Sequence, residues 1–228
     1  DVGIMTLAEN AANAGAMAQA SGLPVFADAD TGYGNALNVR RTVMEFERAG
    51  VAAIMIEDQV SPKRCGMLEG KRVISSEEME GKVKAAVDAR LDDDFVICAR
   101  TDARAVEGLA SAIKRAQAYQ KAGADVIFIE GPKTLEEAEE IGRAIDIPLL
   151  YNVTPTGSVP PLDVKTLERI GFRLLSCSVC MLLTALPAMQ NFLRVLKETG
   201  DVGKASVGAA PMSDYLAVSY THLTLPTI

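Results

Sequence analysis

The sequence predicts an α/β fold, a (β/α)8 barrel of parallel strands of which this chain carries about six. Short apolar runs alternate with amphipathic stretches, the pattern of strand–helix units. The runs are almost continuously apolar, which indicates strands buried on both faces. Five of the six runs end in a polar or charged residue. Because strand ends of a barrel converge on one face, these residues would surround a single pocket.

The elements follow one another in a regular order. The expected strands are 24–28, 52–57, 95–100, 125–130, 148–152 and 173–177. Between them, apolar residues return at three and four positions, which predicts helices over 36–49, 77–90, 108–122 and 135–144. Gly50 and Gly123 follow two of these stretches, where glycine can take the left-handed conformation that ends a helix.

The polar strand ends decide between a barrel and an open sheet. They are Asp28, Glu57, Arg100, Glu130 and Asn152. A doubly wound open sheet would spread these groups along a line, whereas a barrel would gather them around one pocket. We therefore expect the barrel, with about two strands absent at its N-terminal side.

Composition excludes several classes of function. The net charge of -7 over 228 residues leaves no basic footprint for nucleic acid or an anionic membrane. The longest apolar stretch, 179–189, is too short to span a bilayer, so we expect a cytoplasmic protein. Four cysteines are too few for a disulfide framework in a chain of this length, and with His222 as the only histidine a four-ligand zinc site lacks ligands.

Three acids at neighbouring strand ends predict a metal site. Asp28 and Asp30 follow the first expected strand, and alternation places them on one side if the strand continues that far. Glu57 ends the next strand. Carboxylates that gather in this way suit Mg²⁺, with Mn²⁺ as the alternative, held partly through retained waters. Taken alone, the two aspartates also fit the capping and turn-forming acids common at such junctions.

The segment 59–75 predicts a lid over the pocket. It holds no convincing helix or strand and is much longer than an ordinary strand-to-helix loop. Cys65 lies in it beside Lys63 and Arg64, whose charges would favour the thiolate. The alternative is an incidental surface cysteine in a solvated basic loop.

Three segments together carry a family resemblance. They are Ala-Asp-Ala-Asp-Thr-Gly-Tyr-Gly at 27–34, Ile-Glu-Asp-Gln at 56–59 and Pro-Lys-Arg-Cys-Gly at 62–66. With them the chain resembles the isocitrate lyase and phosphoenolpyruvate mutase superfamily from residue 1 to about 200. In length it is similar to the small lyases that act on methylisocitrate or dimethylmalate. The resemblance implies a TIM barrel and a magnesium-dependent carbon–carbon lyase that assembles as a homotetramer.

The resemblance also implies roles for single residues. Asp28, Asp30 and Glu57 match the acids that hold Mg²⁺, and Cys65 matches the general acid or base of the lyases. Lys63 and Arg100 match further catalytic positions, with Arg100 gripping substrate oxygens. The remaining matches imply substrate-binding positions, namely Asp1, Tyr33, Gly66, Glu130 and Asn152. The substrate would be a small 2-hydroxy di- or tricarboxylate, cleaved to a 2-oxo acid and a second carboxylate.

Two departures from the lyases keep alternatives open. The lyases have a histidine after Cys-Gly, whereas this chain has Met67, which does not titrate. Oxaloacetate hydrolysis or decarboxylation is therefore one alternative, and phosphonopyruvate-type phosphorus–carbon chemistry is another. The first two strand–helix units of the barrel are also missing from the expected elements, so an inactive fragment is a third alternative.

The expected domain organisation is simple. Residues 1–200 form a single barrel domain that is incomplete at its N-terminus, and 201–216 form a C-terminal remnant. Residues 217–228 resemble a translated sequencing adaptor and are expected to be a non-native tail. Because this tail contains His222, no histidine-based catalysis is expected.

Overall fold

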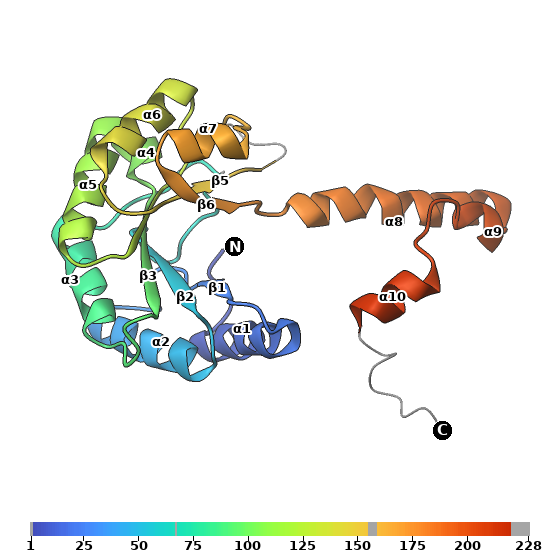
Figure 1. Cartoon of the computed structure of the whole chain (residues 1–228), viewed down its shortest axis with the longest axis horizontal. Helices are drawn as coiled ribbons and strands as arrows, with labels where there is room; N and C mark the ends of the chain where they lie inside the picture. Colours follow the sequence, from blue (N-terminus) through green and yellow to red (C-terminus); the bar gives the residue numbers. More distant parts are fainter. Residues whose placement is uncertain (1, 67, 155–158, 220–228) are drawn as a thin grey trace. The chain divides into compact units, whose positions relative to one another are not determined.

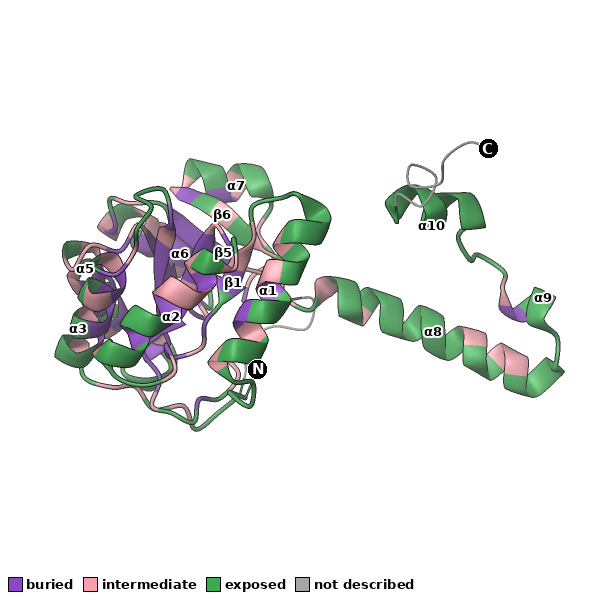
Figure 2. Cartoon of the chain, turned by 90° about the horizontal axis from the view of Figure 1, so that it is seen from below, coloured by how far each residue is buried: buried purple, intermediate pink, exposed green. Residues whose placement is uncertain are grey.

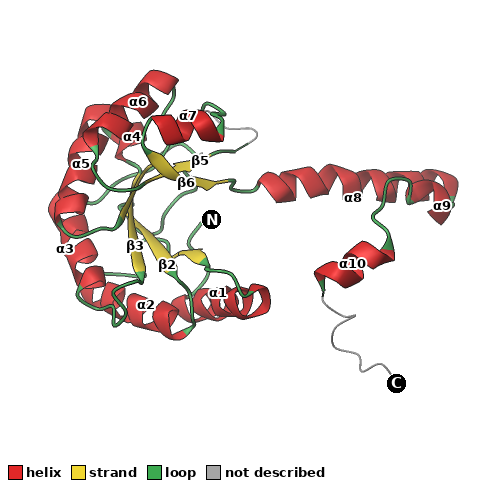
Figure 3. Ribbon diagram, viewed as in Figure 1, coloured by secondary structure: helices red, strands yellow, loops and turns green. Residues whose placement is uncertain are grey.

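Apolar runs, rich in β-branched residues in the second to fourth strands, place six parallel strands side by side in one sheet (Figure 3). The computed structural model describes residues 2–66, 68–154 and 159–219. The strands are β1 (Phe26–Asp28), β2 (Ala53–Glu57), β3 (Val96–Thr101), β4 (Val126–Ile129), β5 (Leu149–Asn152) and β6 (Phe172–Ser176). Each pairs with the next along the chain, so the order is β1-β2-β3-β4-β5-β6. Each of the six expected strands is found within two residues of its expected ends.

One helix precedes the first strand, the others connect successive strands, and all lie outside the curved sheet (Figure 1). They are α1 (Leu7–Ser21), α2 (Ala36–Arg48), α3 (Ser76–Val87), α4 (Ala103–Val106), α5 (Leu109–Lys121), α6 (Leu135–Ala144) and α7 (Val164–Arg169). Five begin at a side-chain cap that accepts from the first-turn amides, provided by Thr6, Asn35, Ser75, Thr134 and Asp163. Sheet and helices together form the incomplete barrel expected from the sequence.

The two faces of the sheet bury different sets of side chains because neighbouring residues of a strand point to opposite sides. The outer face carries Ile54, Ile56, Ile97 and Ile127, which pack against the helices in the main core. The inner face carries a separate apolar cluster of Cys98, Val126, Phe128 and Leu150, with Phe26, Met55, Val96 and Leu174 against it. Figure 2 shows buried segments along the strands and exposed segments on the outer sides of the helices.

The chain divides into two compact units, Asp1–Ser178 and Val179–Ile228. The first contains the whole sheet. The second contains α8 (Cys180–Thr199), α9 (Val202–Ala205) and α10 (Met212–Val218), and α9 packs against α8. In the part of the chain that the structure describes, no helix has the length and apolar character needed to cross a membrane. The boundaries expected at 200 and 216 stay predictions, and most of the expected tail, His222 included, lies outside the described residues.

Candidate functional site

Four predicted site residues lie together at the carboxyl ends of β1 to β4. Asp28, Glu57, Arg100 and Glu130 each stand two residues beyond a member of the inner apolar cluster or its packing partners, so alternation turns them to the same inner face. Glu57 and Arg100 are direct partners in the β2–β3 register. The inner face therefore changes from apolar to charged at one level of the sheet, which makes this level the candidate site.

Lys63 links the three predicted metal-binding acids. Its Nζ lies 2.7 Å from Oδ1 of Asp30, 3.5 Å from Oε2 of Glu57 and 3.6 Å from Oδ2 of Asp28. The Lys63 side chain is only 2% exposed, so this charge is shielded from solvent. Burial by itself lowers the pKa of Lys63, but the surrounding carboxylates outweigh burial and hold that pKa above its usual value.

A tight turn, rather than a continued strand, brings Asp28 and Asp30 to the same place. The strand ends at Asp28, and Asp30 has a left-handed φ of 51°. The Asp30 amide donates to Oδ1 of Asp28 at 2.8 Å, and the Asp30 carbonyl accepts from the Glu57 amide at 2.8 Å. The expected proximity is thus present, but its physical cause is an aspartate-closed turn pinned to β2.

Glu57 is the most buried of the three predicted metal-binding acids. It is 1% exposed, and neither carboxylate oxygen has a hydrogen-bond partner among the described residues. Burial raises the pKa of Glu57 to about 7, against the opposing pull of the Arg100 guanidinium. A carboxylate held in this way would gain from a further cation beside it.

Arg100 is held from three sides. Its Nε donates to Oδ2 of Asp102 at 2.9 Å, and its terminal nitrogens lie 3.4 Å from Oε2 of Glu57 and 3.6 Å from Oε2 of Glu130. The guanidinium also lies over the Phe128 ring, 5.2 Å from its centroid. Burial raises the pKa of Glu130, although Arg100 opposes that shift. The cluster is therefore a buried array of alternating charges.

The expected lid is the segment 59–75, and its described residues form no helix. An antiparallel bridge between Gln59 and Val73 joins its two ends. The Gln59 side chain fixes Arg64 through two hydrogen bonds, donating to its carbonyl at 2.8 Å and accepting from its amide at 2.9 Å. Cys65 follows and is half-buried. At Gly66, an added Cβ would fall 2.6 Å from a terminal nitrogen of Arg100, so the loop backbone lies directly on the charged cluster.

The other predicted residues are placed less closely. Tyr33 accepts a 2.8 Å hydrogen bond from Asn10, which also donates to the Asp28 carbonyl. Asn152 ends β5 and accepts from the Ser178 hydroxyl at 2.6 Å, but no contact joins it to the Arg100 cluster among the residues described. Asp1 and Met67 lie outside the described residues. The site therefore combines Asp28, Asp30, Glu57, Lys63, Arg100 and Glu130 with the loop at Gly66.

Sequence reasoning missed two residues of this site, Asp102 and Lys71. Asp102 directly follows β3 and is fully buried beside Arg100. Lys71 lies in the loop, where its ammonium donates to the Gly66 carbonyl and lies 3.4 Å from Oδ1 of Asp102. The only sequence signal was an acid just past a strand that already ended in Arg100.

The acids fit a divalent cation by their donor chemistry. Carboxylate oxygens are the ligands that Mg²⁺ prefers, and both Glu57 oxygens are buried without a hydrogen-bond partner. Within the described ranges, however, no group of three acid, histidine or cysteine side chains has the spacing to bind one ion directly. The Lys63 ammonium lies among Asp28, Asp30 and Glu57. The residues thus suit a cation held partly through water.

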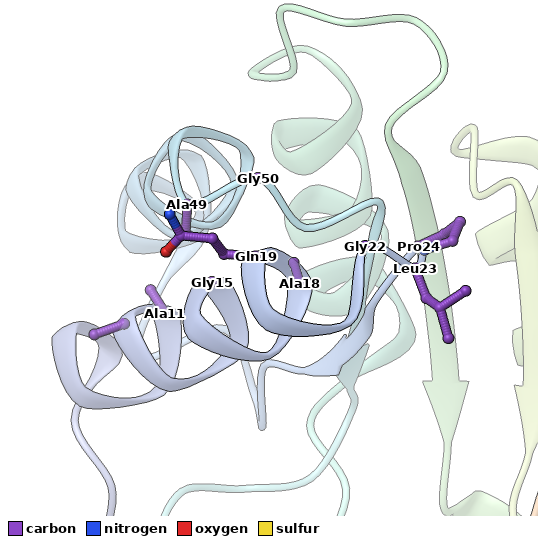
Figure 4. Close-up of a pocket in the computed structure, with 10 residues that line it drawn as sticks. Ala11, Gly15, Ala18, Gln19, Gly22, Leu23, Pro24, Ala49 and Gly50 are labelled. Atoms are coloured by element: carbon purple, nitrogen blue, oxygen red, sulfur yellow. The ribbon is translucent and has the colours of Figure 1, made fainter. Parts of the chain in front are cut away.

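A groove elsewhere in the first unit has a different chemistry. It runs along α1 and the turn after α2 and is lined by small residues such as Ala11, Gly15, Ala18 and Gly50 (Figure 4). None of its lining residues titrates. It therefore offers no group for acid–base work, which leaves the charged cluster as the candidate active site.

The family model described as phosphoenolpyruvate phosphomutase matches residues 1–197. The chain belongs to the phosphoenolpyruvate mutase/isocitrate lyase superfamily. The match covers the sheet and nearly all of α8, so both compact units contain family sequence. The resemblance expected from three short segments is confirmed over most of the chain.

Curated relatives are lyases by name. The chain is 48% identical to a 2,3-dimethylmalate lyase of Eubacterium barkeri over 197 residues, covering 86% of this chain and 68% of the relative. It is 47% identical to a 2-methylisocitrate lyase of Aeropyrum pernix over 200 residues, covering 88% and 64%. The chain thus spans about two thirds of the length of these relatives.

Solved structures of the superfamily have the same fold. A 2,3-dimethylmalate lyase has a TM-score of 0.91 at 36% identity, covering 98% of this chain and 75% of that one. An oxaloacetate acetylhydrolase bound to 3,3-difluorooxalacetate has a TM-score of 0.90 at 36% identity, with coverage of 98% and 76%. A phosphonopyruvate hydrolase in complex with oxalate and Mg²⁺ has a TM-score of 0.85 at 28% identity, with coverage of 97% and 77%.

Proposed function

We propose that this protein is a magnesium-dependent carbon–carbon lyase. Its substrate would be a small 2-hydroxy di- or tricarboxylate of the methylisocitrate or dimethylmalate kind. Cleavage would give a 2-oxo acid and a second carboxylate. The single observation that carries the proposal is the loop with Cys65, whose Gly66 backbone lies on the Arg100 and Glu130 side chains beside the acidic cluster.

The proposed reaction breaks the bond between the hydroxyl-bearing carbon and its neighbour. The hydroxyl loses its proton to solvent and becomes the carbonyl of the 2-oxo acid. The electron pair of the broken bond stays on the departing carbon, next to its carboxylate. The Cys65 thiol would give this carbon a proton, which completes the second product, and solvent would return a proton to the Cys65 thiolate.

Arg100 and Lys63 would balance the negative charge of the substrate and of the acidic cluster. A substrate with two or three carboxylates needs cations around it, and Arg100 offers a forked guanidinium that suits a carboxylate. Lys63 already neutralises part of the charge on Asp28, Asp30 and Glu57. Tyr33, Glu130 and Asn152 remain proposals as substrate-binding residues, as does Asp1.

Asp28, Asp30 and Glu57 would hold Mg²⁺, which supplies a Lewis acid for the substrate hydroxyl and its neighbouring carboxylate. The chemistry of the donor oxygens supports this choice, and one relative in the superfamily has been solved with oxalate and Mg²⁺. Mn²⁺ is the alternative ion. These residues also fix the turn that presents Asp28, the most exposed acid of the three.

Oxaloacetate cleavage is the second candidate. It is favoured by the similarity to an oxaloacetate acetylhydrolase, which equals the dimethylmalate lyase in identity at 36%. The names of the curated relatives favour the lyase. Both reactions need an activated 2-oxo or 2-hydroxy acid, so the same charged cluster would serve either one.

The experiment is product analysis with Mg²⁺ present. The purified protein is incubated separately with 2-methylisocitrate, 2,3-dimethylmalate and oxaloacetate, and products are separated by mass spectrometry. The proposal expects pyruvate and succinate from 2-methylisocitrate, or pyruvate and propionate from 2,3-dimethylmalate, and none of these products when EDTA replaces Mg²⁺. Release of acetate and oxalate from oxaloacetate, with the first two acids intact, would replace the proposal by the second candidate.

The proposed assembly comes from the family resemblance, and the proposed location comes from the sequence. We propose a homotetramer that acts in the cytoplasm on a small carboxylate, without nucleic acid or membrane as a partner. The net charge of -7 supports the last two points, since phosphate-rich surfaces would repel the chain.

A further inference from the structure

We propose that Asp102 is a positioning residue that fixes both Arg100 and the Cys65 loop, and that Lys71 connects the loop to it. The inference rests on the proposed function for its catalytic part. Neither residue is assigned a role by the reaction described above.

The backbone at Asp102 is held rigidly by a second buried acid, Asp58. The Asp102 amide donates to Oδ1 of Asp58 at 2.9 Å, and the Thr101 hydroxyl donates to Oδ2 at 2.7 Å. The Tyr119 hydroxyl donates to that same oxygen at 2.8 Å. Because Asp58 and Asp102 are both fully buried, water does not compete for these bonds. The backbone position from which the Asp102 side chain extends is therefore fixed.

From this point the Asp102 carboxylate clamps Arg100 with two hydrogen bonds. Nε donates to Oδ2 at 2.9 Å, and a terminal nitrogen donates to Oδ1 at 3.2 Å. A two-point contact fixes the plane of a guanidinium as well as its position. Burial would raise the pKa of Asp102, but Arg100 and Lys71 outweigh it and hold that pKa below its usual value. Asp102 is thus a charged clamp.

The same carboxylate also receives the loop. The Lys71 side chain is 5% exposed, and its Nζ lies 3.4 Å from Oδ1 of Asp102. The same ammonium donates to the carbonyl of Gly66. Lys71 therefore connects Gly66, the residue after Cys65, to Asp102, the carboxylate that holds Arg100. One carboxylate sets the position of the proposed proton donor relative to the proposed substrate-binding guanidinium.

The position of Gly66 supports a loop pressed onto this anchor. A Cβ built there would lie 2.6 Å from an Arg100 terminal nitrogen and 2.9 Å from Cδ of Glu130. The loop backbone therefore contacts these side chains directly. Lys71 attaches the loop at this place through its buried ion pair with Asp102 and its hydrogen bond to the Gly66 carbonyl.

The test measures the rate at which iodoacetamide alkylates each cysteine, with mass spectrometry to separate the reaction of Cys65 from that of the others. The exposed Cys177 serves as the reference for free reaction, and the buried Cys98 as the reference for intact folding. Lys71→Met is compared with Lys71→Arg, which keeps the charge. The matched control is Arg72→Met, which removes a neighbouring exposed cation. Lys71→Gln replaces the Met variant if Cys98 becomes reactive in it.

The proposal expects Cys65 to react about ten-fold faster in Lys71→Met, the effect of losing roughly 1.4 kcal/mol of loop attachment. Lys71→Arg should stay near the wild-type rate, and Arg72→Met should not change it. In turnover assays kcat should fall by about the same factor in Lys71→Met with little change in KM. Equal Cys65 rates in the Lys71→Met and Arg72→Met variants would overturn the proposal. Alkylation needs no substrate, so a failed lyase assignment leaves this result readable.

Discussion

The ammonium nitrogen of Lys63 lies 2.7 Å from Oδ1 of Asp30, and the same nitrogen lies within 3.6 Å of Asp28 and Glu57. A loop residue thus carries the counter-charge for acids that come from two strand ends. The acidic cluster and the Cys65 loop are therefore coupled by charge before any substrate or cation arrives.

Lys63→Met should destabilise the metal-free protein. The change keeps the length of the side chain but leaves Glu57, which is 1% exposed, Asp28 and Asp30 without the cation that all three share. Breaking a buried ion pair from one side costs about 3 kcal/mol. The free energy of unfolding is measured with urea in EDTA. Lys84→Met is the control, since it removes an exposed pair with Asp88 and should cost under about 1 kcal/mol. Equal losses in the two variants would contradict the coupling.

Glu57 should give the metal-free protein a pH-dependent stability. Its pKa is about 7 in the folded state, above its ordinary value of 4.5. Between these values the folded state binds more protons than the unfolded state, so the free energy of unfolding falls as pH rises from 4.5 to 7. The predicted loss is about 3 kcal/mol over this range.

Glu57→Gln isolates this contribution because the amide does not titrate. Urea unfolding in EDTA at intervals from pH 5 to pH 7.5 should show the difference between wild type and variant shrinking or reversing in favour of the variant as pH rises. Added Mg²⁺ should flatten the wild-type slope, since a cation favours the carboxylate. Parallel curves for the two proteins would show that Glu57 is already ionised at pH 5.

Gly66→Ala should impair the site more than the fold. The new Cβ would fall 2.6 Å from an Arg100 nitrogen and 2.9 Å from Cδ of Glu130, so the loop must lift or both side chains must move. Turnover should drop by about ten-fold or more, as expected when a proton donor is displaced. Gly81→Ala, a helical position with open space, is the control. The activity of this control should be unchanged, and its melting temperature should be unchanged or slightly raised. An active Gly66→Ala enzyme would argue against a loop seated on Arg100.

Gly142→Ala should weaken the packing of α6 against the turn before β6. A Cβ at Gly142 would clash with the carbonyl oxygen of Ile170, and neither backbone can move without disturbing its own element. The expected loss is about 1 to 3 kcal/mol, typical of overpacking. Urea unfolding monitored by circular dichroism measures it. A stability equal to that of Gly81→Ala would show that the two elements lie further apart.

Periodicity and punctuation were sufficient to predict the strands. The continuous apolar run at 126–129 and the glycine after α5 place β4 within one residue at either end of the expected range. The alternation of inner and outer faces follows directly from such runs. Local hydrophobic patterning therefore determines most of the fold of the first unit.

The site was predictable from the sequence pattern where charged residues stand at strand ends. Asp28, Glu57 and Arg100 could be placed on one face from sequence, because parallel strands end together. Lys71 and Asp102 could not be paired in advance, because their contact depends on how a long loop folds back. For Asp28 and Asp30 the sequence left both a continued strand and a turn open, since a left-handed aspartate leaves no clear mark in the pattern.

Replacement of Cys65 by Ser tests the central claim most directly. The measurement is product formation from 2-methylisocitrate and 2,3-dimethylmalate, with the Mg²⁺-induced rise in melting temperature recorded on the same samples. A lyase that uses the Cys65 thiol as its proton donor predicts loss of turnover in the variant with the Mg²⁺ effect unchanged. Turnover equal to that of the wild type, with the same response to Mg²⁺, would contradict it.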